Sequence, residues 1–133
     1  MNESIHLVVY HNDPGTAQTL VSALSTQFGR VNLINHFEEL RTAIRREHFD
    51  VLVLDVEEAA GGAVERHRMR LTALADLHRE FPSLCIVATH RLADDGLWTD
   101  AMNQGAADVC EPRNDKVIQA VLRERFKYTA VAA

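Results

Sequence analysis

Polar and titratable residues stand directly after several apolar runs of the chain. They are His11-Asn12-Asp13, Asp55, Thr89-His90 and Glu111-Pro112. Two imidazoles and a carboxylate, those of His11, His90 and Asp55, form a set that transition metals bind. The alternative, which we favour, is that these are ordinary titratable loop residues and that the chain holds no metal ion.

Other catalytic patterns are not evident in the chain. Gly61-Gly62 lacks the Lys and Ser/Thr of a phosphate-binding loop, and Asp13-Pro14-Gly15 lacks the glycine spacing of a dinucleotide site. No Ser-His-Asp order or Cys-His pair stands out. We therefore expect a protein that is not an enzyme.

The elements that must position these residues alternate between strand and helix. Short, mostly apolar runs predict buried strands at 5–10, 31–34, 51–54, 84–88 and 108–110. Helical spacing predicts helices from Asp13-Pro14 to Phe28, at 38–47, at 97–103 and around 117–122. Between the second and third of these, a long helix follows the polar stretch after Asp55 and ends at about Phe81. Asp13 is a suitable capping residue and Gly29 a suitable end for the first helix.

This alternation predicts an α/β fold, doubly wound, with a parallel sheet and helices on both faces. The 133 residues fit a single domain spanning 1–133, with a core from about 4 to 127. In such sheets ligands and reactive groups gather at the carboxyl ends of the strands. The polar residues named above are expected there together.

Composition excludes several classes. The chain is 47% hydrophobic and 25% charged, with a net charge of −5, which argues against binding nucleic acid. The arginines at 41, 45 and 46 are interspersed with glutamates and indicate a solvated helix face. Cys85 and Cys110 lie in apolar runs and are expected to be buried, reduced thiols. No run approaches the roughly 20 residues of a membrane span, and the N-terminus lacks a signal peptide, so we expect a cytoplasmic protein.

The order and spacing of these residues resemble the receiver domain of bacterial response regulators over nearly the whole chain. Val53-Leu54-Asp55 matches the strand that ends in the phosphoacceptor, and Val87-Ala88-Thr89 matches the strand that ends in Thr or Ser. Gly105-Ala106-Ala107-Asp108 resembles the turn before strand five, and Asp13-Pro14 the start of helix one. The resemblance implies a flavodoxin-like, five-stranded sheet in the order 2-1-3-4-5 with five helices.

Several positions depart from that family. His11-Asn12 stands where the resemblance implies two acids that hold Mg²⁺, with Asp13 one step further along. Glu111 replaces the Lys that pairs with the phosphoryl oxygens, and His90 replaces a small residue beside the phosphoryl group. Strand five has Asp108 or Val109 where the family often has its switch Tyr or Phe. Without a phosphoryl group we expect the Thr89 hydroxyl to bond to backbone.

These departures favour a degenerate receiver: a signalling or regulatory module that acts through protein contacts, with impaired or absent phosphorylation. One alternative is a working receiver, phosphorylated at Asp55 by a histidine kinase and using Mg²⁺. Another is a flavodoxin-like domain that binds a small ligand. Expected partners are a histidine kinase or an output domain, with a homodimer as a further option. No cofactor is expected otherwise. Trp98 is expected in the core rather than on the surface that receivers use for partners.

Overall fold

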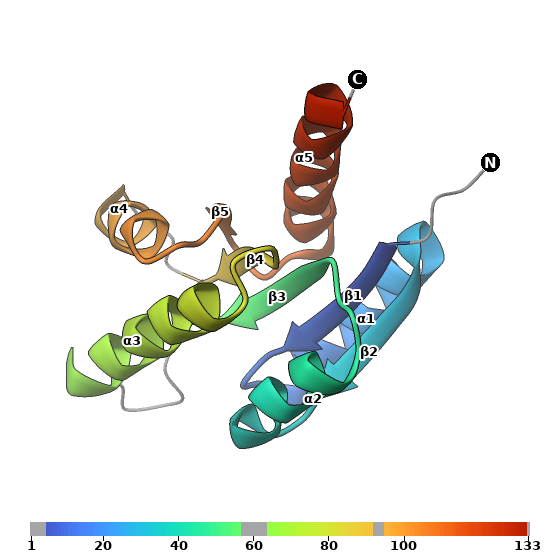
Figure 1. Ribbon diagram of the computed structural model, residues 1–133. Coiled ribbons are helices and arrows are strands. Elements are labelled where there is room, and N and C mark those ends of the chain that lie inside the picture. Colours follow the sequence, from blue (N-terminus) through green and yellow to red (C-terminus); the bar gives the residue numbers. More distant parts are fainter. Residues whose placement is uncertain (1–4, 57–63, 92–94, 133) are drawn as a thin grey trace.

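The computed structural model describes residues 5–56, 64–91 and 95–132, and Gly61-Gly62 lies outside these ranges. Within them the chain alternates between strands and helices, as the apolar pattern predicts (Figure 1). The elements are β1 (Ile5–Tyr10), α1 (Pro14–Phe28), β2 (Gly29–Ile34), the 3-10 helix η1 (Phe37–Glu39), α2 (Leu40–Arg46), β3 (Val51–Asp55), α3 (Val64–Glu80), β4 (Cys85–Thr89), α4 (Asp95–Asn103), β5 (Asp108–Cys110) and α5 (Asn114–Ala132).

The five strands form one parallel sheet in the order β2-β1-β3-β4-β5, which confirms the predicted order. The register sets the strand ends side by side. Asp55 of β3 is paired with Thr89 of β4, and Thr89 with Cys110 of β5. The carboxyl ends of β3, β4 and β5 therefore meet at one edge of the sheet.

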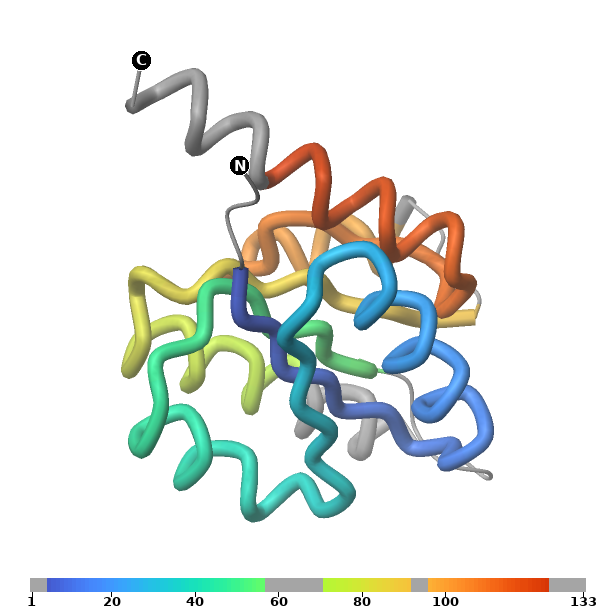
Figure 2. Tube along the Cα trace, turned by 90° about the vertical axis from the view of Figure 1, so that its right-hand side faces the viewer, coloured from blue at the N-terminus to red at the C-terminus, as the bar shows by residue number. Residues whose placement is uncertain are grey.

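Side chains alternate between two buried clusters, one on each face of the sheet. Val51 and Val53 of β3 join a cluster with α1 and α5, whereas Leu52 and Leu54 join a cluster with residues of α2, α3 and α4. Figure 2, together with Figure 1, shows α1 and α5 on one side of the sheet and α2 and α3 on the other. Each fully buried Leu contributes about 1.5–3 kcal/mol relative to exposure. These two clusters hold the strand ends in place.

The ends of α1 follow the local sequence. Asp13 caps the helix, Pro14 occupies its first position, and the N–H of Gly29 donates to the carbonyl of Ser25. Gly29 has φ of 91°, in the left-handed region that glycine adopts without strain. Both predicted ends of this helix are confirmed.

Other boundaries differ slightly from the prediction. β2 begins at Gly29, since the β1 ladder extends back to pair Ile5 with that glycine. The predicted helix over 38–47 divides into η1 and the shorter α2. β3 and β4 each run one residue further, to Asp55 and Thr89, because these two residues pair with each other.

The prediction that Trp98 lies in the core is wrong. Its side chain is 46% exposed on α4. The buried positions of α4 are Leu97 and Ala101, four residues apart and therefore on one face of the helix. Trp98 follows Leu97 and is turned about 100° away from that face. Among the described residues, no helix is long and apolar enough to cross a membrane.

Candidate functional site

Asp55 is the most buried acid at the carboxyl edge of the sheet. It ends β3 and is 1% exposed. The backbone N–H of Asn12 donates to its Oδ2 at 3.0 Å. A hydrogen bond from a backbone amide to a carboxylate is stronger than a neutral one, and it ties the loop after β1 to the end of β3.

His11 lies beside Asp55, as the strand order predicts. Its Nδ1 is 3.6 Å from Asp55 Oδ2, and it accepts the backbone N–H of Asp13 at 3.0 Å. Through this hydrogen bond His11 holds the loop after β1 in place beside Asp55.

The Asp13 side chain caps the first turn of α1. Its Oδ2 accepts the Thr16 hydroxyl at 2.6 Å and the Thr16 N–H at 2.9 Å. The Thr16 hydroxyl, followed by the Thr16 amide, holds the pKa of the Asp13 carboxyl below its ordinary value. Both capping bonds use the same oxygen, Oδ2, of the Asp13 carboxylate.

Thr89 has an unusual environment. It is 0% exposed, and its Oγ1 has no hydrogen-bond partner among the described residues. The expectation that this hydroxyl bonds to backbone is wrong, because the backbone groups around it are used otherwise: the Thr89 carbonyl accepts the N–H of Val56. A buried hydroxyl without a partner costs free energy, on the order of 1–3 kcal/mol, and so calls for a reason.

The remaining predicted residues follow β4 and β5 at the same edge. The backbone N–H of His90 donates to the carbonyl of Cys110 at 3.0 Å, and its side chain is half-buried. Glu111 follows β5, and its carbonyl accepts the N–H of Arg113 at 2.8 Å. The strand register therefore brings His90 and Glu111 to the same edge as Asp55 and Thr89.

Two residues near this edge were not predicted. The Tyr10 hydroxyl donates to Asn12 Oδ1 at 2.9 Å. Arg91 lies close enough for its positive charge to contribute to the lowered pKa of Asp13, after the larger contributions from Thr16. A signal for Arg91 was present in the sequence, since it stands two residues after Thr89 at the same strand end.

The donor set does not fit Mg²⁺. Hard cations take carboxylate and water oxygens, and of the residues after β1 only Asp13 carries a carboxylate, which caps α1. In the described ranges, no three His, Cys, Asp or Glu side chains are grouped so as to hold a metal ion. His11, Asp55 and His90 lie within these ranges and are not grouped in this way.

Both cysteines are buried and neither forms a disulfide, as expected. Burial, followed by the negative charge of Asp108, raises the pKa of the Cys110 thiol to about 12. A thiol with that pKa stays protonated at neutral pH and is a poor nucleophile. Cys110 thus adds apolar volume at the strand edge rather than reactivity.

The chain is similar to known proteins in its structure rather than in its sequence family. Neither a protein-family model nor a curated protein matches the chain. Solved structures do match it over nearly their full length. A response regulator from Thermotoga maritima is 23% identical, with a TM-score of 0.73 over 95% of this chain and 97% of that one.

The chain has the fold of a receiver domain. A two-component response regulator from Clostridium difficile is 18% identical, with a TM-score of 0.74 over 93% of this chain and 97% of that one. The BeF3-activated DrrB receiver domain is 21% identical, with a TM-score of 0.71 over 95% and 99% of the two chains. At these identities the receiver likeness concerns the fold, and the chemistry depends on this chain's own residues.

Proposed function

We propose that the chain is a signalling module of the receiver type that acts through protein contacts, with phosphorylation of Asp55 impaired or absent. Its role is regulatory rather than enzymatic, and residues 1–133 form one domain. The observation that carries this proposal is the use of the acids and the histidine near Asp55. Asp13 caps α1 and His11 accepts a loop amide, so neither provides what a phosphoryl group requires.

The electrostatic argument concerns the charge on a transferring phosphoryl group. Its oxygens need positive partners, and catalysis of this reaction is almost entirely positioning and electrostatics. Glu111 follows β5 at the position where receivers have Lys, and it adds a negative charge at the edge that holds Asp55. Losing one such stabilising donor typically costs about 10²–10³ in rate. The loss of the cation together with the metal ligands supports the proposal that phosphorylation of Asp55 is impaired.

A second function is favoured by one observation. Thr89 carries a buried hydroxyl that has no partner within the described part of the chain, on the strand next to Asp55 and in register with it. A phosphoryl group on Asp55 is an acceptor that such a hydroxyl lacks. This supports the alternative that the chain is a working receiver, phosphorylated at Asp55 by a histidine kinase.

Partners follow from either function. We infer a cytoplasmic protein whose partner is a histidine kinase or an output domain, without direct contact to nucleic acid or membrane. One similar structure is the beryllofluoride-activated NtrC4 receiver domain dimer, at 16% identity and a TM-score of 0.70. That likeness supports testing this chain for a homodimer.

The test is labelling by acetyl phosphate in the presence of Mg²⁺, read by intact-protein mass spectrometry. The unmodified chain is expected to gain no phosphoryl group. The triple variant His11→Asp, Asn12→Asp, Glu111→Lys is expected to become labelled, because it gains two hard oxygen ligands and a cation. The same variant with Asp55→Asn is the matched control.

Two outcomes count against this proposal. Efficient labelling of the unmodified chain, lost in Asp55→Asn, identifies a working receiver. A folded triple variant that is not labelled even after the added change His90→Ala shows that the strand ends are not arranged for phosphotransfer. Calorimetric Mg²⁺ titration of each variant separates failure of metal binding from failure of transfer.

A further inference from the structure

A chain of contacts leads from Asp55 to the opposite face of the sheet. The carboxylate accepts the backbone N–H of Asn12 at 3.0 Å, and the side-chain oxygen of Asn12 accepts the Tyr10 hydroxyl at 2.9 Å. The ring of Tyr10 then meets Phe37 edge to face, with centroids 5.4 Å apart at 74°. Asn12 thus connects Asp55, on the α1–α5 side, with a tyrosine packed in the α2–α3 cluster.

Tyr10 is well placed to respond to its hydrogen bond. It is a buried residue whose ring is held by packing while its hydroxyl reaches into the loop after β1. An edge-to-face aromatic pair has a preferred geometry, so a shift of one ring alters the position of the other. Phe37 begins η1, and a shift of Phe37 moves the segment that leads into α2.

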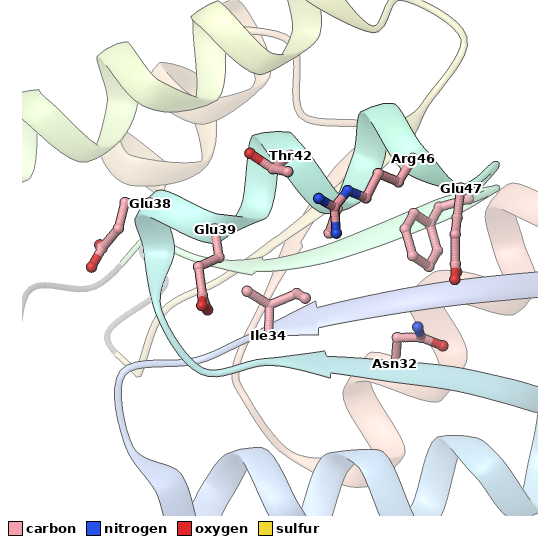
Figure 3. Close-up of a pocket in the computed structure, with 9 residues that line it drawn as sticks. Asn32, Ile34, Glu38, Glu39, Thr42, Arg46 and Glu47 are labelled. Carbon is pink, nitrogen blue, oxygen red and sulfur yellow. The ribbon is translucent and has the colours of Figure 1, made fainter.

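A pocket lies at the far end of this path, between β2 and α2 (Figure 3). Its volume is about 390 Å³, within the range of ligand pockets. Ile34, Ala43 and Phe49 give it an apolar floor. Its polar wall is formed by Asn32, Thr42, Arg46 and three glutamates, Glu38, Glu39 and Glu47.

The charges of the polar wall favour a positively charged occupant of the pocket. The lining carries three carboxylates and one guanidinium, and Figure 3 shows Glu39 and Glu47 reaching from the two ends of α2 toward Ile34 and Asn32 of β2. A Lys or Arg side chain has a long apolar stem and a cationic head. The apolar stem would pack on the apolar floor of the pocket, and the cationic head would pair with the glutamate carboxylates.

The contacts of β5 are of a different kind. Asp108 stands on β5 and pairs with Arg123 of α5 at 2.6 Å, while its other oxygen accepts the N–H of Val109. This ion pair joins β5 to α5. Tyr10, on β1, instead bonds to Asn12 of the loop that contacts Asp55.

We propose that the state of Asp55 is passed through Asn12 and Tyr10 to the pocket between β2 and α2, which docks a basic side chain of a protein partner. This inference rests on the second function proposed above, in which phosphorylation changes the charge of Asp55. A change in the charge of Asp55 alters the strength of its bond to Asn12, because bonds to an ionised acceptor are the stronger ones. The positions of the loop after β1, of the Tyr10 ring and of the Phe37 ring then change in turn. Glu38 and Glu39, which follow Phe37 in η1, move with it.

The path is tested by amide NMR on the full chain, comparing the unmodified protein with Asp55→Asn. Removing the charge is expected to shift the signals of Asn12, Phe37, Glu38 and Glu39, and to leave Lys116 of α5 unmoved. In a Tyr10→Phe background, which removes only the hydroxyl, the shift at Asn12 remains while those at Phe37 to Glu39 are lost. Shifts at 37–39 that persist in Tyr10→Phe, or that never arise, overturn the path.

The docking pocket is tested by titration with acetyl-arginine amide, and with its uncharged citrulline analogue as a control. Saturable shifts at Asn32, Thr42 and Glu47 are expected with the arginine compound alone. Glu39→Gln and Glu47→Gln should each weaken binding about two- to fivefold, as expected for an exposed ion pair. Asp115→Asn, an exposed acid of α5, is the matched control and should leave the affinity unchanged.

The outcomes are separable from those of the labelling experiment. Neither NMR test uses phosphate, so the path and the pocket stand or fall whether or not Asp55 accepts a phosphoryl group. No arginine-dependent shift up to about 10 mM, a concentration that detects even millimolar affinity, overturns the docking pocket. Equal binding to the unmodified chain and to Asp55→Asn overturns the coupling between Asp55 and the pocket.

Discussion

At the amino end of the sheet the buried ring of His6 has partners at both nitrogens, whereas at the carboxyl end the buried hydroxyl of Thr89 has none among the residues that the structure describes. His6 Nδ1 meets the His48 carbonyl at 3.1 Å, and Nε2 meets Asn32 Oδ1 at 2.9 Å. The His6 backbone N–H donates to Asp50, and the ring contacts Phe49 with centroids 4.3 Å apart. Both residues are buried, at 6% and 0% exposed, so burial alone does not distinguish them.

The difference lies in what each group contributes. A buried polar group whose bonds are all made within the fold stabilises that fold and specifies its packing. One without a partner lowers stability unless something outside the fold completes it. The amino end therefore stabilises the fold through the bonds that His6 makes to β2 and to the segment between α2 and β3, whereas the Thr89 hydroxyl at the carboxyl end makes no such contribution.

The largest effect is expected at the amino end. His6→Ala leaves Asn32 and the His48 carbonyl without their partner and removes the ring against Phe49, so unfolding free energy should fall by roughly 2–4 kcal/mol. Denaturant melts measure this loss. His36→Ala, at an exposed position without a side-chain capping bond, is the matched control and should change stability by less than about 0.5 kcal/mol. Similar losses in both variants would remove the contrast on which this comparison depends.

Asp13 lies at the carboxyl end of the sheet, like Thr89, but its carboxylate accepts hydrogen bonds from Thr16, as the His6 ring is bonded at the amino end. It should therefore behave as a structural residue: Asp13→Ala lowers the melting temperature through loss of the α1 cap, while Asp13→Asn preserves most of it. Since the pKa of Asp13 is lowered in the fold, its ionised cap is fully present above the ordinary carboxyl pKa of about 4. The stabilisation is lost as the pH falls through the lower, folded value.

Melts from pH 7 down to pH 2 measure that dependence. The difference in stability between the unmodified chain and Asp13→Asn should narrow or reverse in acid, because the amide does not titrate. A difference that stays constant over this range would show that Asp13 does not act through its charge.

Much of the fold could be predicted from patterns that the backbone obeys locally. The apolar run before Asp55 and the Asp13-Pro14 start of α1 each carry their structural reason within a few residues, and both are confirmed. Alternation of strands and helices was enough for a parallel sheet, since crossovers are right-handed. The strand order then placed His11 beside Asp55.

The predictions that were wrong, and the contacts that were missed, depend on partners distant in sequence. Whether Trp98 faces the core depends on how α4 is rotated about its axis, and its neighbours Leu97 and Ala101 took the buried face. Whether Thr89 finds a hydrogen bond depends on backbone groups of β3 and β5. The Tyr10–Asn12 bond was missed because a strand tyrosine in an apolar run reads as core, and nothing nearby shows where its hydroxyl reaches.

The smallest effect is expected at Thr89 itself, and its sign is the sharpest test of the comparison. Thr89→Val keeps the side-chain shape and removes the unpartnered hydroxyl, so unfolding free energy should rise, by roughly 1 kcal/mol. Thr89→Ser keeps the hydroxyl and leaves a small cavity, so it should lower stability by a similar amount. Denaturant unfolding of both variants measures the two changes in unfolding free energy. The values compare directly where the free energy falls with denaturant concentration at the same slope as in the unmodified chain. A loss of 1 kcal/mol or more in Thr89→Val would mean that the hydroxyl already has a structural partner. The carboxyl end would then be as fully satisfied as the amino end, and Thr89 would no longer mark a group kept for a ligand.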